Sequence, residues 1–254
     1  GLIPLVNLLN PVVVGLMVLR KGVLEVAIIF AWAILPIGVW AIVGDIAPLI
    51  MLFAISGLAW LLRESESWEF TLLATIAIGL SVEIYLRFQP AILDGLFQQL
   101  ELLLVTNNLQ GIQLEDLRES MGSFIGVGYM FLAIVLLILA RWMQASLFNP
   151  GGFQKEFHQL RIGQKSALGL AGFIVLGSYQ LLIPQSWVFY LILPLLFSGI
   201  GLVHAVVDNK KLSSLSLIAF YALLIVLPIV LQLIVLLALV DSWYDFRSRL
   251  QQST

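Results

Sequence analysis

The feature that most limits what this chain can fold into is a series of long apolar runs that covers nearly all of it. A helix needs about 20 apolar residues to cross the hydrocarbon core of a bilayer, because that core is about 30 Å thick and each residue rises about 1.5 Å. Eight segments approach that length: 2–19, 22–43, 46–62, 68–87, 122–141, 167–183, 187–207 and 213–241. The sequence therefore predicts an all-α fold, a polytopic transmembrane helix bundle of about eight spans, with residues 1–254 forming a single integral membrane domain.

Composition indicates that lipid rather than water covers most of the surface. The chain is 61% hydrophobic and 11% charged, whereas about a quarter of the residues in a soluble domain are charged. The lipid bilayer is therefore the first predicted partner. The net charge is −2 and the basic residues are scattered in ones and twos, so nucleic acid is not a predicted partner.

Several classes of chemistry lack their usual sequence signatures. The chain has no cysteine and two histidines, which excludes thiolate metal sites and cysteine nucleophiles and argues against a multi-histidine metal centre. It also contains no HExxH, GxSxG, P-loop or GxGxxG motif. Those motifs mark zinc proteolysis, acyl transfer, ATP hydrolysis and dinucleotide binding. We therefore predict no catalytic residues, no metal site and no cofactor, and an enzyme is the minority interpretation.

The distribution of lysine and arginine predicts which side of the membrane each connection faces. One set of connections holds nine basic residues and the other holds four. The richer set is expected in the cytoplasm, which makes the chain a multi-pass protein of a bacterial inner (cytoplasmic) membrane. Segment 88–121 and the C-terminal tail are expected outside, with the alternative that 213–241 kinks at Pro228 instead of crossing simply. The richer set is Arg20, Lys21, Arg63, Arg141, Lys155, Arg161, Lys165, Lys210 and Lys211, and the other is Arg87, Arg118, Arg247 and Arg249.

The external segment 88–121 has the pattern of an amphipathic helix. Apolar residues recur at helical spacing at Ile92, Leu96 and Leu100, which predicts a helix on the membrane surface. A polar piece follows, and its residues 115–119 give the external side an acidic character.

The cytoplasmic segment 142–166 is predicted to form a short surface helix after a strong turn signal at 149–152. Its apolar face is too short to anchor a protein already held by eight spans, so we expect it to contact a membrane protein partner or lipid. The alternative is that it plugs the inner mouth of the bundle. The turn should also bring His158 toward Asp208, which shares a helix face with His204. The predicted contact residues are Phe153, Phe157, His158, Arg161, Asp208, Asp241, Asp245 and Arg247.

A second group of polar residues near the predicted outer side is the candidate substrate-binding site. Asn7 and Asn10 interrupt an apolar run, and Glu83 and Arg87 are four residues apart near the outer end of a predicted span. Ionisable residues inside a membrane are costly and mark function by default. The alternatives are an extracytoplasmic turn for the asparagines and an interfacial salt bridge for the charged pair.

Five short motifs carry a resemblance to a known family: LRKG at 19–22, NPGGF at 149–153, EFHQLR at 156–161, VDSW at 240–243 and DFR at 245–247. With these motifs the chain resembles the YybS-like family of multi-pass bacterial membrane proteins of unassigned activity. That family is considered similar to the substrate-capturing subunits of energy-coupling-factor vitamin transporters, which bind a micronutrient and dock on an ATPase module. Those subunits have small residues spaced four apart on the first helix, and here only Gly15 could take that role.

Two functions follow as expectations. The resemblance implies a protein related to substrate capture or transport, and the alternative is a non-catalytic accessory or scaffold subunit of a membrane protein complex. Family members also begin with a helix ahead of the basic turn. Because residue 1 is glycine inside an apolar run, either an initiator methionine was removed or residues precede it.

Overall fold

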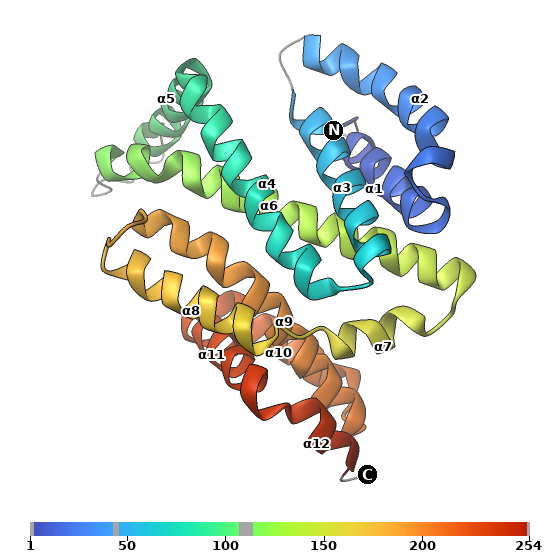
Figure 1. The fold of residues 1–254 in the computed structure, drawn as a ribbon. Helices are drawn as coiled ribbons and strands as arrows, with labels where there is room; N and C mark the ends of the chain where they lie inside the picture. Colours follow the sequence, from blue (N-terminus) through green and yellow to red (C-terminus); the bar gives the residue numbers. More distant parts are fainter. Residues whose placement is uncertain (1–2, 43–45, 107–113, 253–254) are drawn as a thin grey trace.

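The computed structural model describes residues 3–42, 46–106 and 114–252. The described residues form helices and no strand, which confirms the predicted all-α fold. The elements labelled in Figure 1 are α1 (Ile3–Lys21), α2 (Val23–Ile42), α3 (Ala47–Ser65), α4 (Trp68–Phe88), α5 (Pro90–Thr106), α6 (Leu114–Phe148), α7 (Gly152–Gln159), α8 (Gln164–Ser178), η1 (Gln185–Trp187), α9 (Val188–Asn209), α10 (Ser214–Val226), α11 (Pro228–Tyr244) and α12 (Phe246–Gln252).

Four helices among the described residues are long and apolar enough to cross a membrane, or five if α10 and α11 count as one bent span. They are α3, α4, the Ser120–Phe148 part of α6, and α9 together with η1. The number of about eight spans is not confirmed, because α8 has 15 residues and the apolar part of α2 is described only over Val23–Val39.

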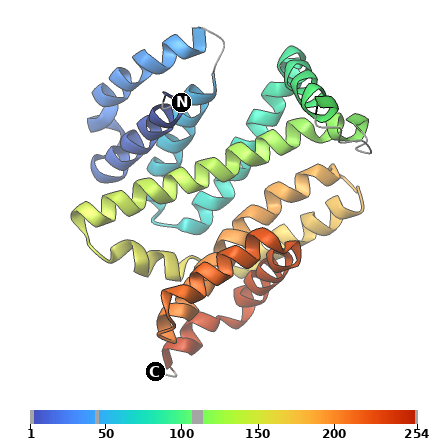
Figure 2. The same cartoon turned by 180° about the vertical axis from the view of Figure 1, so that it is seen from behind.

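Helix α6 is the central element of the molecule. It lies against α4 and also contacts α1, α3 and α9. Helices α1–α3 pack together on one side of it, and α8, α11 and α12 pack around α9 on the other, as the two views in Figures 1 and 2 show. The core runs through all of these helices, and among its fully buried members are Val12, Ile55, Leu72, Ile134 and Leu195.

The connections predicted to be cytoplasmic lie together at one end of the molecule, which we call the basic end. Nη1 of Arg63, in the last turn of α3, donates to the carbonyl of Leu19 near the end of α1 at 2.8 Å and so joins the ends of these two helices. The guanidinium of Arg20 lies 3.4 Å from the centre of the Phe148 ring, where α6 ends. Helix α7 then packs against α6 and α9.

Helix α5 confirms a helix within 88–121, at the end of the molecule opposite the basic end, and its position on a membrane surface stays a prediction. Leu96 and Leu103 are exposed on it, as expected for a helix lying in a membrane surface. Helix α6 begins at Leu114, so positions 115–119 belong to the first turns of a 35-residue helix and not to a separate surface piece. Their side chains lie outside the described residues, and the predicted acidic face stays a prediction.

Helices α10 and α11 differ most from the sequence prediction. Segment 213–241 was expected to cross the membrane, but the two helices meet at Pro228 with a bend of 113°. Proline has no N–H to continue α10, and it holds the preceding Leu227 in an extended conformation with φ −116° and ψ 103°. The pair returns to the basic end, where Asp245 lies 2.7 Å from Arg161. The prediction that the C-terminal tail lies on the opposite side from 142–166 is therefore wrong.

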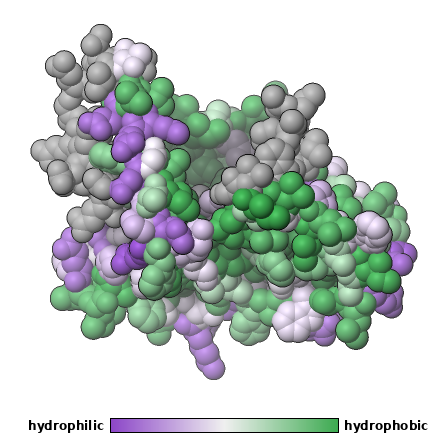
Figure 3. Space-filling model, turned by 90° about the horizontal axis from the view of Figure 1, so that it is seen from above, coloured by the Kyte–Doolittle hydropathy of each residue, from purple (hydrophilic) through white to green (hydrophobic). Residues whose placement is uncertain are grey.

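This correction increases the charge asymmetry between the two ends. Arg247 and Arg249 move to the basic end, and Arg87 and Arg118 remain as the basic residues of the opposite connections. The described surface between the ends is largely hydrophobic, and Figure 3 shows hydrophobic side chains covering much of the face seen from above, with hydrophilic ones gathered at one side. That pattern is expected of helices that contact lipid.

Candidate functional site

The charged pair predicted on α4 is present and buried. Glu83 is 1% exposed, and its carboxylate accepts a hydrogen bond from Arg87 Nη2 at 2.6 Å, four residues along the same helix. Trp187 Nε1 at 3.2 Å and Tyr190 Oη at 2.9 Å also lie within hydrogen-bond distance of it. The salt-bridge interpretation is confirmed, and the carboxylate also ties α4 to α9.

The backbones of α4 and α6 approach each other closely beside this carboxylate. A Cβ on Gly126 of α6 would collide with the hydroxyl of Tyr190 and lie 2.6 Å from the carbonyl oxygen of Gly79 on α4. A Cβ on Gly79 would lie 2.5 Å from the Tyr190 ring. The two glycines therefore let the tyrosine ring enter between α4 and α6 and reach Glu83, which makes this region a packed junction.

Of the four predicted substrate-binding residues, Glu83 and Arg87 form a pair, and Asn10 lies on a different helix. Asn10 lies on α1, which packs against α2, α3 and α6, whereas Glu83 and Arg87 lie where α4, α6 and α9 meet. The side chain of Asn7 is outside the described residues. A common site for these residues stays a prediction, and the contacts of Glu83 are those of a structural link.

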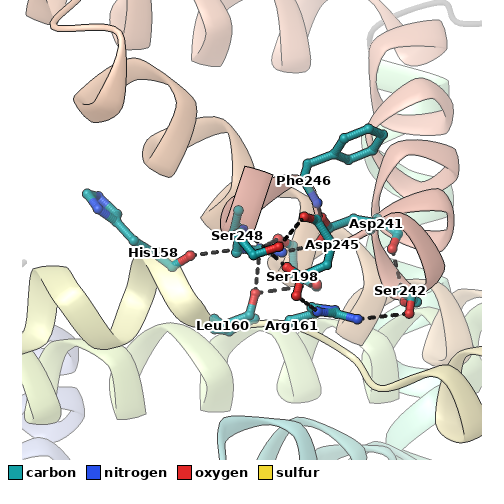
Figure 4. Close-up of polar contacts among 11 residues, drawn as sticks. His158, Leu160, Arg161, Ser198, Asp241, Ser242, Asp245, Phe246 and Ser248 are labelled. Carbon is teal, nitrogen blue, oxygen red and sulfur yellow. Dashed lines mark hydrogen bonds and ion pairs between the residues drawn. The ribbon is translucent and has the colours of Figure 1, made fainter. Parts of the chain in front are cut away.

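Asp241 and Asp245, two of the predicted contact residues near the C-terminus, lie in one cluster of polar contacts with Arg161 (Figure 4). Arg247 is 8% exposed, and its guanidinium pairs with Asp241, which is 0% exposed. It also donates to three carbonyl oxygens: His158 at 2.7 Å, Leu160 at 2.6 Å and Ser198 at 3.0 Å. One side chain of α12 thus donates hydrogen bonds to carbonyl groups at the end of α7 and on α9. The carbonyl groups at the end of a helix have no partner within that helix, so they need such a donor.

A second ion pair completes this cluster, which we call the C-terminal clasp. Arg161 pairs with Asp245 at 2.7 Å and donates to the carbonyl of Ser242 at 3.0 Å. Burial raises the pKa of Asp245, but the hydrogen bond from the Ser248 backbone N–H and the charge of Arg161 lower it more, so the net pKa lies below its ordinary value. The carboxylate is therefore charged at neutral pH and holds α12 against the chain after α7.

The surface helix α7 is covered by the chain itself. Phe157 and Leu160 are buried, the Phe153 and Phe157 rings stack at 5.5 Å, and Trp68 of α4 contacts Phe153 edge to face at 6.5 Å. Arg141 of α6 holds the helix through its ion pair with Glu156, in which Nε lies 2.9 Å from Oε2. Helices α9 and α4 thus cover part of the apolar face of α7, and the contact of these residues with a partner stays a prediction.

His158 lies on α7 and His204 lies beside it on α9, with partners that differ in part from the expected ones. His158 Nδ1 lies 3.6 Å from Asp208, as the turn at 149–152 predicts. His204, which shares a helix face with Asp208, instead lies 2.8 Å from the hydroxyl of Tyr221. Burial lowers the pKa of His158, the Asp208 carboxylate raises it and Arg247 lowers it, and the net pKa is below its ordinary value. His158 is therefore mainly neutral at pH 7.

These side chains line a hollow of about 480 Å³ between α6, α7, α9 and α10, which we call the aromatic pocket. Trp142 and Tyr221 are not among the predicted site residues, and Tyr221 lies within an apolar run. Tyr221 carried no sequence signal of a site. The lining residues are Ile138, Trp142, Ala145, Ser146, Gly151, Phe153, Gln154, Phe157, His158, His204 and Tyr221.

A larger, more polar hollow of about 820 Å³ also opens at the basic end. Two of its charged side chains already have partners, since Arg141 pairs with Glu156 and Arg63 donates a hydrogen bond to the backbone carbonyl of Leu19. Its lining residues are Leu19, Leu62, Arg63, Glu64, Glu66, Trp68, Arg141 and Glu156. No group of three His, Asp or Glu side chains within the described parts of the chain is placed to hold a metal ion.

The fold defines the class as an all-α protein with four or five helices that are long and apolar enough to cross a membrane, and the aromatic pocket lies at its basic end. Comparison of the chain with family models, curated proteins and solved structures finds no match.

Proposed function

We propose that this chain belongs to the substrate-capture or transport class of membrane proteins and binds a flat, mainly apolar small molecule in the aromatic pocket. The observation that carries the proposal is the lining of that pocket, in which six aromatic or imidazole rings surround a few polar groups. Small-molecule sites are concave, have volumes of about 300–1,000 Å³ and combine mainly apolar walls with a small number of polar groups.

The polar groups of the pocket suggest how such a ligand would be oriented. Gln154, His204 and the hydroxyl of Tyr221 line it, and each can donate or accept a hydrogen bond. The carboxylate of Asp208 is held by Gln154 at 3.3 Å and so lies at its edge. A ligand with one or two polar groups on an otherwise apolar ring fits this arrangement.

The resemblance to the YybS-like family supports the same class, because that family is considered similar to vitamin-capturing subunits. In this proposal the basic end faces the cytoplasm of a bacterial inner membrane, as the positive-inside rule favours. Helices α1, α2 and α8 cross together with the four long apolar helices. The α10–α11 pair is then a re-entrant hairpin in place of the eighth span.

The test is to identify small molecules that co-purify with the chain and to fill the pocket. Ser146 lines the pocket and is exposed, so Ser146→Trp places an indole at its mouth. Ser178→Trp, on an exposed position of α8 away from the pocket, is the matched control. We expect mass spectrometry of mildly extracted protein to find a ring-containing compound in wild type and in Ser178→Trp, reduced at least tenfold in Ser146→Trp. Equal amounts in all three would overturn the proposal.

A second candidate, a non-catalytic accessory or scaffold subunit, is favoured by the outer face of α2. Leu24 and Ile28 are 94% and 73% exposed, and Trp32, Leu35 and Val39 continue the same stripe at helical spacing. A partner helix would bury this stripe. Cross-linking from a photoreactive residue at position 28 distinguishes the two, since a specific protein adduct supports the scaffold and lipid adducts alone contradict it.

A further inference from the structure

A second groove lies away from the aromatic pocket, between α1, α2 and α3. Its volume is about 600 Å³, and its walls are almost entirely apolar. It extends from Val23 and Trp60 near the basic end to Phe30 and Phe53, a length of about 10 Å along each helix. The rings of Phe30 and Phe53 contact edge to face at 5.3 Å and close its inner end. The lining residues are Val18, Val23, Leu24, Val26, Ala27, Phe30, Phe53, Ser56, Gly57 and Trp60.

Two cationic residues lie at the turn between α1 and α2, next to Val23 of the groove lining, and Arg63 also lines the 820 Å³ hollow. A Cβ on Gly22, the turn between α1 and α2, would lie 3.6 Å from Nε of Arg63, so the guanidinium lies directly over the turn. One of its nitrogens donates to Leu19, and its other N–H groups make no hydrogen bond within the described part of the chain. Lys21 is exposed one residue before the turn. Both charges are therefore placed to bind a phosphate.

The size of the groove decides what can fill it. A stretch of α-helix as long as the groove, about 10 Å wide and about 10 Å long, displaces about 790 Å³, more than the volume available. A hydrocarbon chain is narrower than a helix, so it can enter the groove. Its depth of about 10 Å reaches from the interface into one leaflet of a hydrocarbon core about 30 Å thick.

We propose that the groove between α1, α2 and α3 holds the acyl chains of one membrane phospholipid, with Arg63 and Lys21 binding its phosphate. The apolar walls take the chains, and the exposed indole of Trp60 lies at the level of the headgroup. The bound lipid fills the space between α2 and the α1–α3 pair, so α2 is held partly through lipid. This site is independent of the aromatic pocket, and either proposal can fail without the other.

Two glycines provide a matched test. A Cβ on Gly57, which lines the groove, or on Gly38, which does not, meets no atom within 4 Å. Gly57→Leu therefore projects a side chain into the groove from a Cβ that meets no neighbouring atom, and Gly38→Leu is its control on α2. We expect wild type and Gly38→Leu, washed extensively in mild detergent, to retain about one phospholipid per chain by mass spectrometry, and Gly57→Leu to lose it. Equal retention in both variants would show annular lipid only and overturn the proposal.

A charge variant tests the phosphate contact. With phosphatidylglycerol or phosphatidylethanolamine added to delipidated protein, native mass spectrometry should show both lipids bound, because both carry a phosphate. Lys21→Gln should weaken each severalfold, and Glu25→Gln, a charge change on the first turn of α2, should not. Unchanged binding in Lys21→Gln would overturn the assignment of the phosphate. Binding of only one lipid would overturn recognition through the phosphate alone.

Discussion

At the scale of single residues, the junction of Gly79, Gly126 and Tyr190 determines how closely α4, α6 and α9 pack. The tyrosine hydroxyl lies 2.9 Å from Glu83 and 3.1 Å from the carbonyl of Ser123. Any side chain on Gly126 must displace the ring, because its Cβ would collide with that hydroxyl. The buried carboxylate would then lose a partner, and unsatisfied buried charge is costly.

We predict that Gly126→Ala lowers the free energy of unfolding by about 2–3 kcal/mol through overpacking and the lost hydrogen bond. Gly128→Ala, two residues along the same helix, is the control, because a Cβ there meets no atom within 4 Å. It should leave stability unchanged or raise it by up to about 1 kcal/mol through helix propensity. Thermal unfolding in detergent measures both, and equal melting temperatures would contradict the junction.

His158 gives the molecule a pH dependence of defined sign. Its pKa in the folded state is lowered from its ordinary value, with burial as the largest cause. The unfolded chain therefore binds the proton more tightly, and stability falls as the pH drops through about 6.5, the ordinary histidine pKa. We predict a falling melting temperature of wild type between pH 7.5 and 5.5 and a shallower fall in His158→Gln. Asp208→Asn removes the charge that raises this pKa, so it should steepen the fall; identical slopes in all three would refute this assignment.

At the scale of elements, the C-terminal clasp attaches α12 to α7, α9 and α11 through Arg247. Removing its guanidinium leaves Asp241 charged, buried and without its ion-pair partner, together with three carbonyls that lose a donor. Helix α12 should then detach as a unit from α7, α9 and α11.

We predict that Arg247→Ala destabilises the protein by about 3–5 kcal/mol, the usual cost of breaking a buried ion pair. Arg249→Ala, which removes an exposed arginine of the same helix, should have little effect. Hydrogen exchange locates the change, with faster exchange expected in α12 and in 158–162 of Arg247→Ala. Adding Asp241→Asn to Arg247→Ala should recover part of the loss, and a further loss would contradict a charge-based role.

Element positions were predictable where local chemistry decides them. The turn signal at 149–152 correctly predicted the start of α7, and the four-residue spacing of Glu83 and Arg87 correctly predicted their ion pair. The direction of α11 was not predictable, because an apolar run over 213–241 is compatible with a span and with a hairpin equally. The hairpin is shown only by the tertiary contact of Arg161 with Asp245. The aromatic pocket was missed for a related reason: Tyr221 and Trp142 are 79 residues apart, and no sequence pattern joins them.

At the scale of the whole molecule, α7 and the C-terminal residues share one end, and α5 lies at the other. Because the chain has no cysteine, single cysteines report this directly. We predict that Lys155→Cys and Arg249→Cys react with impermeant reagent from the same side of the membrane and that Gln98→Cys reacts from the opposite side. Labelling of position 249 together with position 98 would refute the hairpin.

The short helices of the C-terminal half have a consequence for the surrounding bilayer. Helix α8 has 15 residues and is about 22 Å long, whereas an unperturbed hydrocarbon core is about 30 Å thick. In the proposed topology, in which α8 crosses the membrane, lipid beside α8 must thin to match it, while lipid beside α6 need not, so the protein should deform its membrane unevenly and prefer regions of short acyl chains. We predict higher thermal stability in bilayers of 14-carbon than of 20-carbon lipids, measured in nanodiscs. A protein of this shape would be distributed between membranes by their thickness as well as by its partners.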